Sequence, residues 1–270
     1  MGKSIEKTIE ELCPMDDVFF EKLAHDINFC EEVLQVILQR KDLKVVKAEP
    51  QKSLRNVKGR SVIVDVLCKD TNGNYHNIEI QKHDNDDHQK RVRYNGANVD
   101  TFIAEKGSDF KDLPELYVVY ISSFDFFGKN RTVYHIDRVL RETGDVVDNG
   151  FHEVYVNTQV DDNSEISELM ELFKSPDAEG NEKFPKVTKA IKHFKTGKGR
   201  IEMCKSVEEY AEVKAKEAAE KAAKAAAQET TKETILRALR KGMVVEDIAD
   251  ITGLTVDEIK AIQNEMCELV

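Results

Sequence analysis

Residues 59–81 read GRSVIVDVLCKDTNGNYHNIEIQ, and this stretch decides the fold. Its first half is rich in β-branched residues and its second half alternates in polarity, which is typical of two β-strands. The segment Thr71-Asn72-Gly73 lies between them and indicates the turn of a β-hairpin. Side chains alternate between the two faces of a strand, so Glu79 and Gln81 must share one face.

The length of the hairpin loop decides where Asp65 lies. A three-residue loop, with Gly73 in the left-handed conformation, pairs residues whose numbers sum to 144 and therefore puts Asp65 opposite Glu79. Directly paired positions have Cβ atoms roughly 4.5 to 5.5 Å apart on one face. A two-residue turn at Asn72-Gly73 would instead put the two carboxylates on opposite faces. The three-residue loop predicts that they converge.

Two converging carboxylates in a half-buried sheet repel each other unless a cation lies between them. Hard oxygen ligands at this separation suit Mg²⁺ or Mn²⁺. The alternative is that Asp65 is a strand acid satisfied within the sheet and that Glu79 and Gln81 are its solvent-facing neighbours. The next segment, HQKRVRYNGANV, favours the metal hypothesis because it sets Lys90 and Arg91 beside the acids. Metal ions and cations together suit phosphodiester chemistry.

Further helices and strands extend outward from the hairpin. Residues 1–45 are expected to be helical, with apolar residues at three-and-four spacing. A second helix is expected over 84–106, a buried strand over 116–121, and further strands near 131–136 and 153–157. This order of elements predicts a mixed α/β fold.

The remainder of the chain is expected to be an all-α extension. We predict four segments: an α/β domain over 1–160, a helical connector, acidic and then basic, over 161–205, a long Ala/Glu/Lys-rich helix over 206–241, and a helix-turn-helix-like module over 242–270. The long helix has almost no aliphatic seam, which indicates a solvated spacer rather than a tight coiled coil.

The C-terminal module has the apolar pattern of a helix-turn-helix, with a core predicted at Ile248, Ala249, Leu254 and Ile259. Its second helix carries Asp257 and Glu258 against Lys260, and acids at the start of a recognition helix would face phosphates with the wrong sign. We therefore expect a packing module, which can form a homodimer through these helices, in preference to a DNA-reading one.

The net charge of −11 excludes a uniformly basic protein and nothing narrower. Residues 137–182 hold 13 acids against 3 bases, while 40–60 and 183–205 are basic. We expect the acidic stretch to lie away from any DNA path. The five cysteines are scattered without metal-site spacing, and no apolar run can span a membrane, which predicts a cytoplasmic protein without a membrane partner.

Residues 10–160 resemble the PD-(D/E)XK nuclease superfamily, specifically its Rpn-type branch of transposases and recombination-promoting nucleases. The resemblance rests on D-x13-E-x-Q on the hairpin, on Gly59-Arg60 before it, on DDVFF near the N-terminus and on the strand LYVVYIS. It implies a restriction-endonuclease-like core with a central mixed sheet flanked by helices. It also implies DNA as partner, with Asp65, Glu79 and the Ile80 carbonyl as ligands of Mg²⁺ or Mn²⁺.

Gln81 occupies the position where the superfamily usually has a lysine that orients the attacking water. An amide can replace this lysine only by hydrogen bonding. Our candidate for a displaced lysine is Lys90, whereas Lys82 points to the opposite face of the strand. The alternative for Lys90 and Arg91 is a solvated helix face or nonspecific DNA contact.

Other candidates surround these residues. Arg60, Arg91 and Arg93 are expected to contact DNA, although Arg60 can equally flank the strand. A further acidic ligand is expected from the N-terminal helices; the candidates are Asp16, Asp17, Glu31 and Glu32, of which the first two can instead cap a helix. His83 and His88 lie near the site and could contact a metal, but they are five residues apart around a helix start and are expected to be solvent-exposed. Tyr94 is expected to pack in the core.

The sequence therefore predicts a metal-dependent DNA endonuclease with Asp65, Glu79, Gln81 and Lys90 as catalytic residues. The resemblance implies a role in DNA mobilisation or recombination. The alternative is a catalytically inactive DNA-associated or protein-interaction module that retains the fold, and a more remote one is a metal-dependent hydrolase of another phosphoester.

Overall fold

The computed structural model describes residues 5–56, 59–84, 87–104, 106–177 and 181–268. Its centre is a six-stranded mixed sheet of order β1-β2-β3-β4-β8-β5. The strands β1, β2 and β3 pair antiparallel, β3, β4 and β8 pair parallel, and β5 is antiparallel to β8. Their bounds are β1 Val45–Leu54, β2 Val62–Asp70, β3 Tyr75–Gln81, β4 Leu116–Ser122, β5 Val133–Ile136 and β8 Phe151–Asn157.

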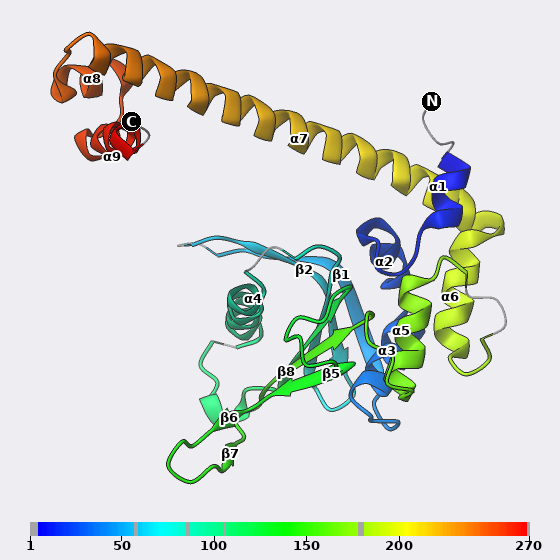
Figure 1. Cartoon of the computed structure of the whole chain (residues 1–270). Helices are drawn as coiled ribbons and strands as arrows, with labels where there is room; N and C mark the ends of the chain where they lie inside the picture. Colours follow the sequence, from blue (N-terminus) through cyan, green and yellow to red (C-terminus); the bar gives the residue numbers. More distant parts are fainter. Residues whose placement is uncertain (1–4, 57–58, 85–86, 105, 178–180, 269–270) are drawn as a thin grey trace. The chain divides into compact units, whose positions relative to one another are not determined.

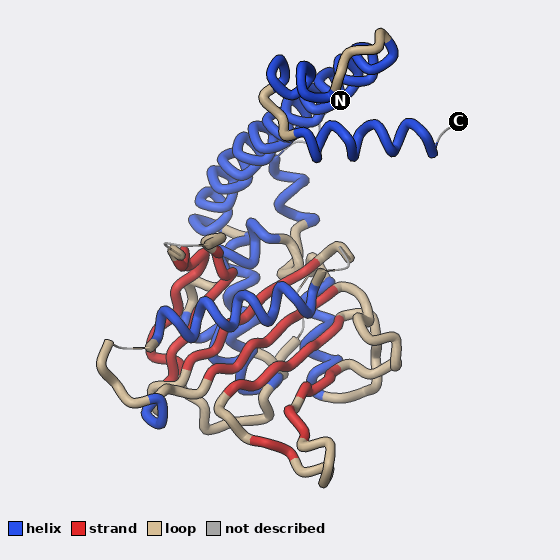
Figure 2. Tube along the Cα trace, turned by 90° about the vertical axis from the view of Figure 1, so that its left-hand side faces the viewer, coloured by secondary structure: helices blue, strands red, loops and turns tan. Residues whose placement is uncertain are grey.

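Helices cover both faces of this sheet, as Figures 1 and 2 show. α4 (His88–Ile103) lies across one face and packs on β1, β2 and β4. α3, α5 and α6 cover the other face. The remaining N-terminal bounds are α1 Ile5–Glu11, α2 Asp17–Leu23 and α3 Ile27–Ile37, and those of the later helices are α5 Glu165–Lys174 and α6 Pro185–Lys195. This arrangement confirms the predicted mixed sheet flanked by helices.

Two compact units divide the chain, Met1–Glu208 and Glu209–Val270, with the boundary inside α7 (Gly197–Arg240). α7 begins earlier than the predicted residue 206. All residues from 211 to 230 are exposed, which confirms the absence of an apolar seam. In the second unit, Ile235, Ile248 and Ile259 form a buried core with Ala249 and Leu254 against it, as predicted for α8 (Val245–Thr252) and α9 (Val256–Glu268).

The strand β1 was not predicted from the sequence. Its sequence, VVKAEPQKSL, contains charged residues and Pro50, and only its two ends are buried. Proline and exposed polar side chains are tolerated on a sheet edge, where one side of the strand has no partner. Pairing with β2 therefore makes this segment a strand, whereas its own composition gives little β signal.

The helix boundaries in the structure differ from the predicted ones. The N-terminal 45 residues form three short helices instead of one helical stretch. α4 is shorter at both ends than the predicted 84–106; residues 85–86 and 105 of that range lie outside the described residues. A small two-stranded sheet, β6 (Arg138–Val139) with β7 (Val146–Val147), and a 3-10 turn at Phe110–Asp112 complete the first unit.

Gly96 allows α4 to approach the sheet closely. A Cβ atom at this position would lie 2.6 Å from Cε2 of Phe151 on β8. Gly96→Val is therefore expected to lower the free energy of unfolding by about 1–3 kcal/mol, because overpacking displaces the ring or the helix. Chemical denaturation measures this effect, and Thr101→Ala on the exposed side of α4 is the control. A stability of Gly96→Val equal to wild type would show that α4 can move without cost.

Candidate metal and phosphodiester site

The register of the β2–β3 hairpin decides the geometry of the site. Val66 pairs with Ile78 and Leu67 with Asn77, so paired residue numbers sum to 144 as the three-residue loop predicts. Gly73 has a φ of +89°, the left-handed conformation that such a loop requires. Asp65 consequently falls on the same face as Glu79, one position beyond the last backbone pair of the ladder.

The side chain of Asp65 accepts a hydrogen bond at the end of the β2–β3 ladder. The N–H of Ile80 donates to Oδ2 of Asp65 at 2.9 Å, so the carboxylate replaces a backbone acceptor on β2. In an antiparallel pair the N–H and C=O of one residue face the same neighbour. The Ile80 carbonyl therefore also faces the β2 side, the side on which Asp65 lies; the family resemblance implied this carbonyl as a third ligand.

Glu79 is almost completely buried, with 7% of its surface exposed. Its Oε1 accepts hydrogen bonds from Nδ2 of Asn77 at 2.9 Å and from Nδ2 of Asn95 at 3.2 Å. Asn95 lies on α4, directly over the sheet, and is itself buried. One oxygen of Glu79 is thus fixed in orientation by two amides.

The two acids are difficult to ionise together. Burial raises the pKa of Asp65 to about 6, opposed in part by the Ile80 N–H, and the negative charge of Asp17 adds to the rise. Burial also holds the pKa of Glu79 well above its usual range, with the charge of Asp65 as the next cause. Such paired shifts are common at functional sites.

Arg91 is the cation that reaches this site. Its Nη1 donates to Oε1 of Gln81 at 3.0 Å, and its Nη2 forms an ion pair with Asp87 at 3.2 Å. The charge of Arg91 lowers the pKa of both Asp65 and Glu79, although less than burial raises it. Nε2 of Gln81 donates to the His83 carbonyl at 2.6 Å, so each end of this amide already has a partner.

The donor set fits a hard divalent cation. One oxygen acceptor, Oδ1 of Asn77, is buried without a hydrogen-bond partner. The charge of Asp65 raises the pKa of Glu79, so the two carboxylates lie close enough to repel each other, and a cation between them would relieve this repulsion. In the part of the chain that the structure describes, no group of three or more His, Cys, Asp and Glu could hold a metal ion. A cation here would rely on Asp65, Glu79, the Ile80 carbonyl and water or phosphate oxygens, the ligand set that Mg²⁺ accepts.

The side chains of Lys90 and Arg91 leave α4 in different directions. Successive residues of a helix point about 100° apart. Arg91 and Asn95 therefore face the acids, whereas Lys90 and Arg93 are exposed and line a separate cavity beside α4. Arg60 is exposed at the start of β2. The sequence-predicted site residues thus separate into a group at the acids (Asp65, Glu79, Ile80, Gln81, Arg91) and a peripheral group (Arg60, Lys90, Arg93).

The acids of the N-terminal helices are mostly engaged elsewhere. Glu31 forms ion pairs with Lys44 and Lys186 at 3.3 and 2.6 Å, and Glu32 accepts from the N–H of Val187. These two acids join α3 to β1 and α6. In the structure their carboxylates are therefore engaged in contacts that stabilise the packing of α3.

Asp16 and Asp17 lie nearer to the site. Asp16 accepts from the N–H of Cys13 at 2.9 Å and forms an ion pair with Lys82, which lies directly after β3. Asp17, the first residue of α2, raises the pKa of Asp65 by its charge. Of the four acids considered as further ligands, Asp17 is therefore the one whose charge is among the largest influences on the pKa of Asp65.

Two expectations for neighbouring residues were wrong. His88 is 1% exposed and buried between Tyr120 and Asp84, with ring nitrogens 2.5 Å from the Tyr120 hydroxyl and 2.9 Å from Asp84. Its position in the first turn of α4, against the sheet, buries it. Tyr94 is exposed, and its hydroxyl donates to the carbonyl of Arg60 at 2.6 Å instead of packing in the core. His83 is exposed as expected.

Sequence reasoning missed the buried amides Asn77 and Asn95. Two signals could have found them: Asn77, Glu79 and Gln81 alternate on one face of a strand, and Asn95 follows Arg91 by one helical turn. Gln51 on β1, whose side chain acts to lower the pKa of Asp65, was missed because β1 itself was not predicted.

The mixed sheet with two converging acids agrees with a comparison of the chain with protein families. The model of the PD-(D/E)XK nuclease family transposases matches residues 26–228, so the chain belongs to this family. Nucleases of this family typically use a divalent metal. No curated protein and no solved structure gave a significant match. In the described residues, no helix has the length and apolar character to cross a membrane.

Proposed function

We propose that the protein is a metal-dependent DNA endonuclease that hydrolyses phosphodiester bonds, with a role in DNA mobilisation or recombination. The observation that carries the proposal is the convergence of Asp65 and Glu79, both with raised pKa values, at the end of the β2–β3 ladder. Family membership supports phosphodiester hydrolysis and DNA as the substrate. A cytoplasmic location remains a prediction.

Each residue has a distinct part in this proposal. Asp65, Glu79 and the Ile80 carbonyl would hold Mg²⁺ or Mn²⁺, which supplies a Lewis acid and lowers the pKa of bound water. Asn77 and Asn95 fix Oε1 of Glu79 and so fix the direction of its second oxygen. Gln81 holds the guanidinium of Arg91 beside the acids. Arg91 thereby provides the positive charge that a lysine at position 81 would provide, and it can stabilise charge on a phosphate.

A second candidate is a catalytically inactive DNA-associated module that retains the fold. The observation that favours it is Gln81, whose amide has a partner at each end and cannot carry a charge. The two candidates differ in a single outcome, which is metal-dependent cleavage.

Purified full-length protein is expected to nick supercoiled plasmid in Mg²⁺ or Mn²⁺ and to stop nicking in excess chelator. The melting temperature is also expected to rise with Mn²⁺ concentration, because a ligand that binds only the folded state stabilises it. Gel electrophoresis and differential scanning fluorimetry measure the two effects. Nicking that persists in excess chelator would exclude the metal mechanism, and a Mn²⁺-dependent shift without nicking would favour the inactive module.

A further inference from the structure

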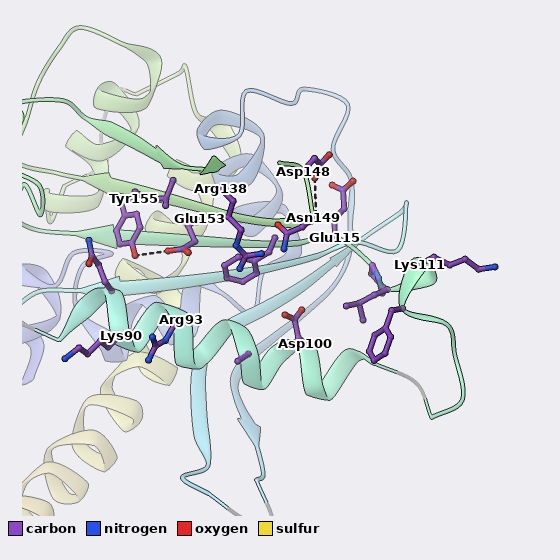
Figure 3. A pocket seen from close by; sticks show the side chains of 18 residues that line it. Lys90, Arg93, Asp100, Lys111, Glu115, Arg138, Asp148, Asn149, Glu153 and Tyr155 are labelled. Atoms are coloured by element: carbon purple, nitrogen blue, oxygen red, sulfur yellow. Dashed lines mark hydrogen bonds between the residues drawn. The ribbon is translucent and has the colours of Figure 1, made fainter. Parts of the chain in front are cut away.

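A cavity of about 930 Å³ lies between α4 and the strand β8 (Figure 3). We call it the α4 groove. One wall is α4, with Lys90, Arg93 and Asp100, and across from it lie Arg138, Glu153 and Tyr155. Its volume is at the upper end of the range of about 300–1,000 Å³ for ligand pockets. Lys90 and Arg93 flank Arg91, so one end of the groove lies at the same turn of α4 as the residue that contacts Gln81 beside the paired acids.

Two cations of the groove are available to a ligand. Among the described residues, Lys90 and Arg93 have no hydrogen-bond or ion-pair partner, and both are exposed. Arg138 lies with its guanidinium carbon 5.7 Å from the centre of the Phe151 ring, a cation–π contact that holds it over the floor of the groove. These three cations are positioned to contact successive anionic groups.

Aromatic side chains accompany the cations. Phe110 lines the groove at the 3-10 turn and is 92% exposed, the most exposed large apolar side chain among the described residues. Phe151 and Tyr155 also line it. A fully exposed phenylalanine costs solvation free energy without stabilising the fold. Phe110 follows the C-terminal end of α4, at the other end of the groove from Lys90 and Arg93. The groove therefore suits an extended ligand that carries both flat rings and negative charges.

Acids also line the groove, and two of them, Asp148 and Glu153, belong to the acidic stretch 137–182. Part of this stretch therefore lies on the nucleic-acid path proposed below, contrary to the expectation from the sequence. Three of the lining acids have protein partners: Glu153 accepts from Tyr155, Glu115 from Tyr117, and Asp148 from the N–H of Gly150. Burial raises the pKa of Asp100, opposed by Arg138. The cations and acids that line the groove balance in number, which favours a single strand over a duplex because a duplex carries about twice the phosphate charge per unit length.

We propose that the α4 groove binds a single-stranded segment of nucleic acid, with Lys90, Arg93 and Arg138 on phosphates and Phe110 stacked on a base. Single strands are bound by cations that follow the backbone together with aromatic rings that stack on bases, which is the combination present here. The choice of nucleic acid as the ligand rests on the proposed nuclease function. The groove would hold the part of the nucleic-acid strand that continues from Asp65 and Glu79.

Binding is measured by fluorescence anisotropy with a labelled oligothymidylate of about 20 nucleotides and a duplex of equal length, in chelator so that no cleavage occurs. The full-length protein is expected to bind the single strand more tightly than the duplex. Phe110→Ala should weaken single-strand binding roughly tenfold, the effect of losing one stacked base. Arg93→Ala should lower the slope of log affinity against log salt by about 0.7, the loss of one phosphate contact.

Matched controls isolate the groove. Phe102→Ala removes a half-exposed phenylalanine of α4 that does not line the groove, and Lys189→Ala removes an exposed cation of α6 on the other face of the sheet. Both are expected to bind like wild type. Wild-type binding by Phe110→Ala and Arg93→Ala, or tighter binding of duplex than of single strand, would overturn the groove proposal. Plasmid nicking tests the nuclease function separately. If wild type does not nick plasmid but the groove variants lose single-strand binding, only the nuclease proposal fails. If wild type nicks plasmid but the groove variants bind normally, only the groove proposal fails.

Discussion

Glu79→Gln is expected to lower the rate of plasmid nicking by about 10³-fold, and Asp65→Asn by a similar factor. Either change removes a charged ligand from the site, and loss of several kcal/mol of electrostatic stabilisation corresponds to this factor. The Gln and Asn side chains keep the size of the originals, so the hairpin and its contacts with Asn77 and Asn95 should be retained. Plasmid nicking at saturating Mn²⁺ measures the effect.

The same two variants are expected to be more stable than wild type without metal. The raised pKa values of Asp65 and Glu79 mean that ionising them costs free energy in the folded state. Replacing such uncompensated buried charges is expected to raise the free energy of unfolding by about 1–3 kcal/mol at pH 8. Mn²⁺ should then stabilise wild type and not the variants, which separates a ligand role from a purely structural one.

The pH dependence has a definite sign. An acid whose folded-state pKa is raised binds more protons when folded, so the stability of wild type falls as the pH rises from the unfolded value of 3.8 through about 6. The advantage of Asp65→Asn should therefore be largest above about pH 6 and vanish below about pH 4. An advantage that is constant from pH 4 to 8 would show that desolvation of the charged carboxylate is not its cause.

Glu49→Gln on β1 is the matched control for these substitutions. Glu49 pairs with Lys52 at 2.7 Å and with Lys47 at 3.0 Å, and its pKa is lowered although burial acts to raise it. Its replacement is expected to leave nicking unchanged and to reduce stability slightly. Nicking by Glu79→Gln at the rate of Glu49→Gln would remove the catalytic assignment.

Arg91→Ala is expected to lower the nicking rate by about 10²-fold at saturating DNA, the effect of losing one charged donor at a site of developing charge. Arg91→Lys should recover part of the rate, because a lysine keeps the charge but not the planar contact with Gln81. Lys90→Ala should change the rate at saturating DNA only a few-fold and act mainly on DNA affinity through the α4 groove. Rates at saturating and limiting DNA distinguish these effects.

A larger loss of nicking rate in Lys90→Ala than in Arg91→Ala would support the displaced-lysine hypothesis. If Lys90→Ala lost more rate at saturating DNA than Arg91→Ala, the cation used in catalysis would be Lys90, and α4 would have to rotate when DNA binds. Lys189→Ala is the control for loss of one exposed positive charge far from the site. It is expected to nick like wild type.

The paired acids could be predicted from the sequence because they depend on local rules. The period of a strand fixes which side chains share a face, and the length of one loop fixes the register, so Thr71-Asn72-Gly73 was sufficient to bring Asp65 opposite Glu79. The mixed sheet, the helical C-terminal region and the core around Ile248 followed from periodicity in the same way.

Other features depend on contacts between distant segments, which local rules do not contain. β1 is a strand because β2 offers it an edge, and α4 turns Arg91 toward Gln81 because Gly96 fits against Phe151. A helix rotates about 100° per residue, so the packing of α4 determines that Arg91, and not Lys90, contacts Gln81. The sequence by itself determined the acids of the site; the tertiary structure decided which cation reaches them and that a groove lies beside them, because both depend on how α4 packs on the sheet.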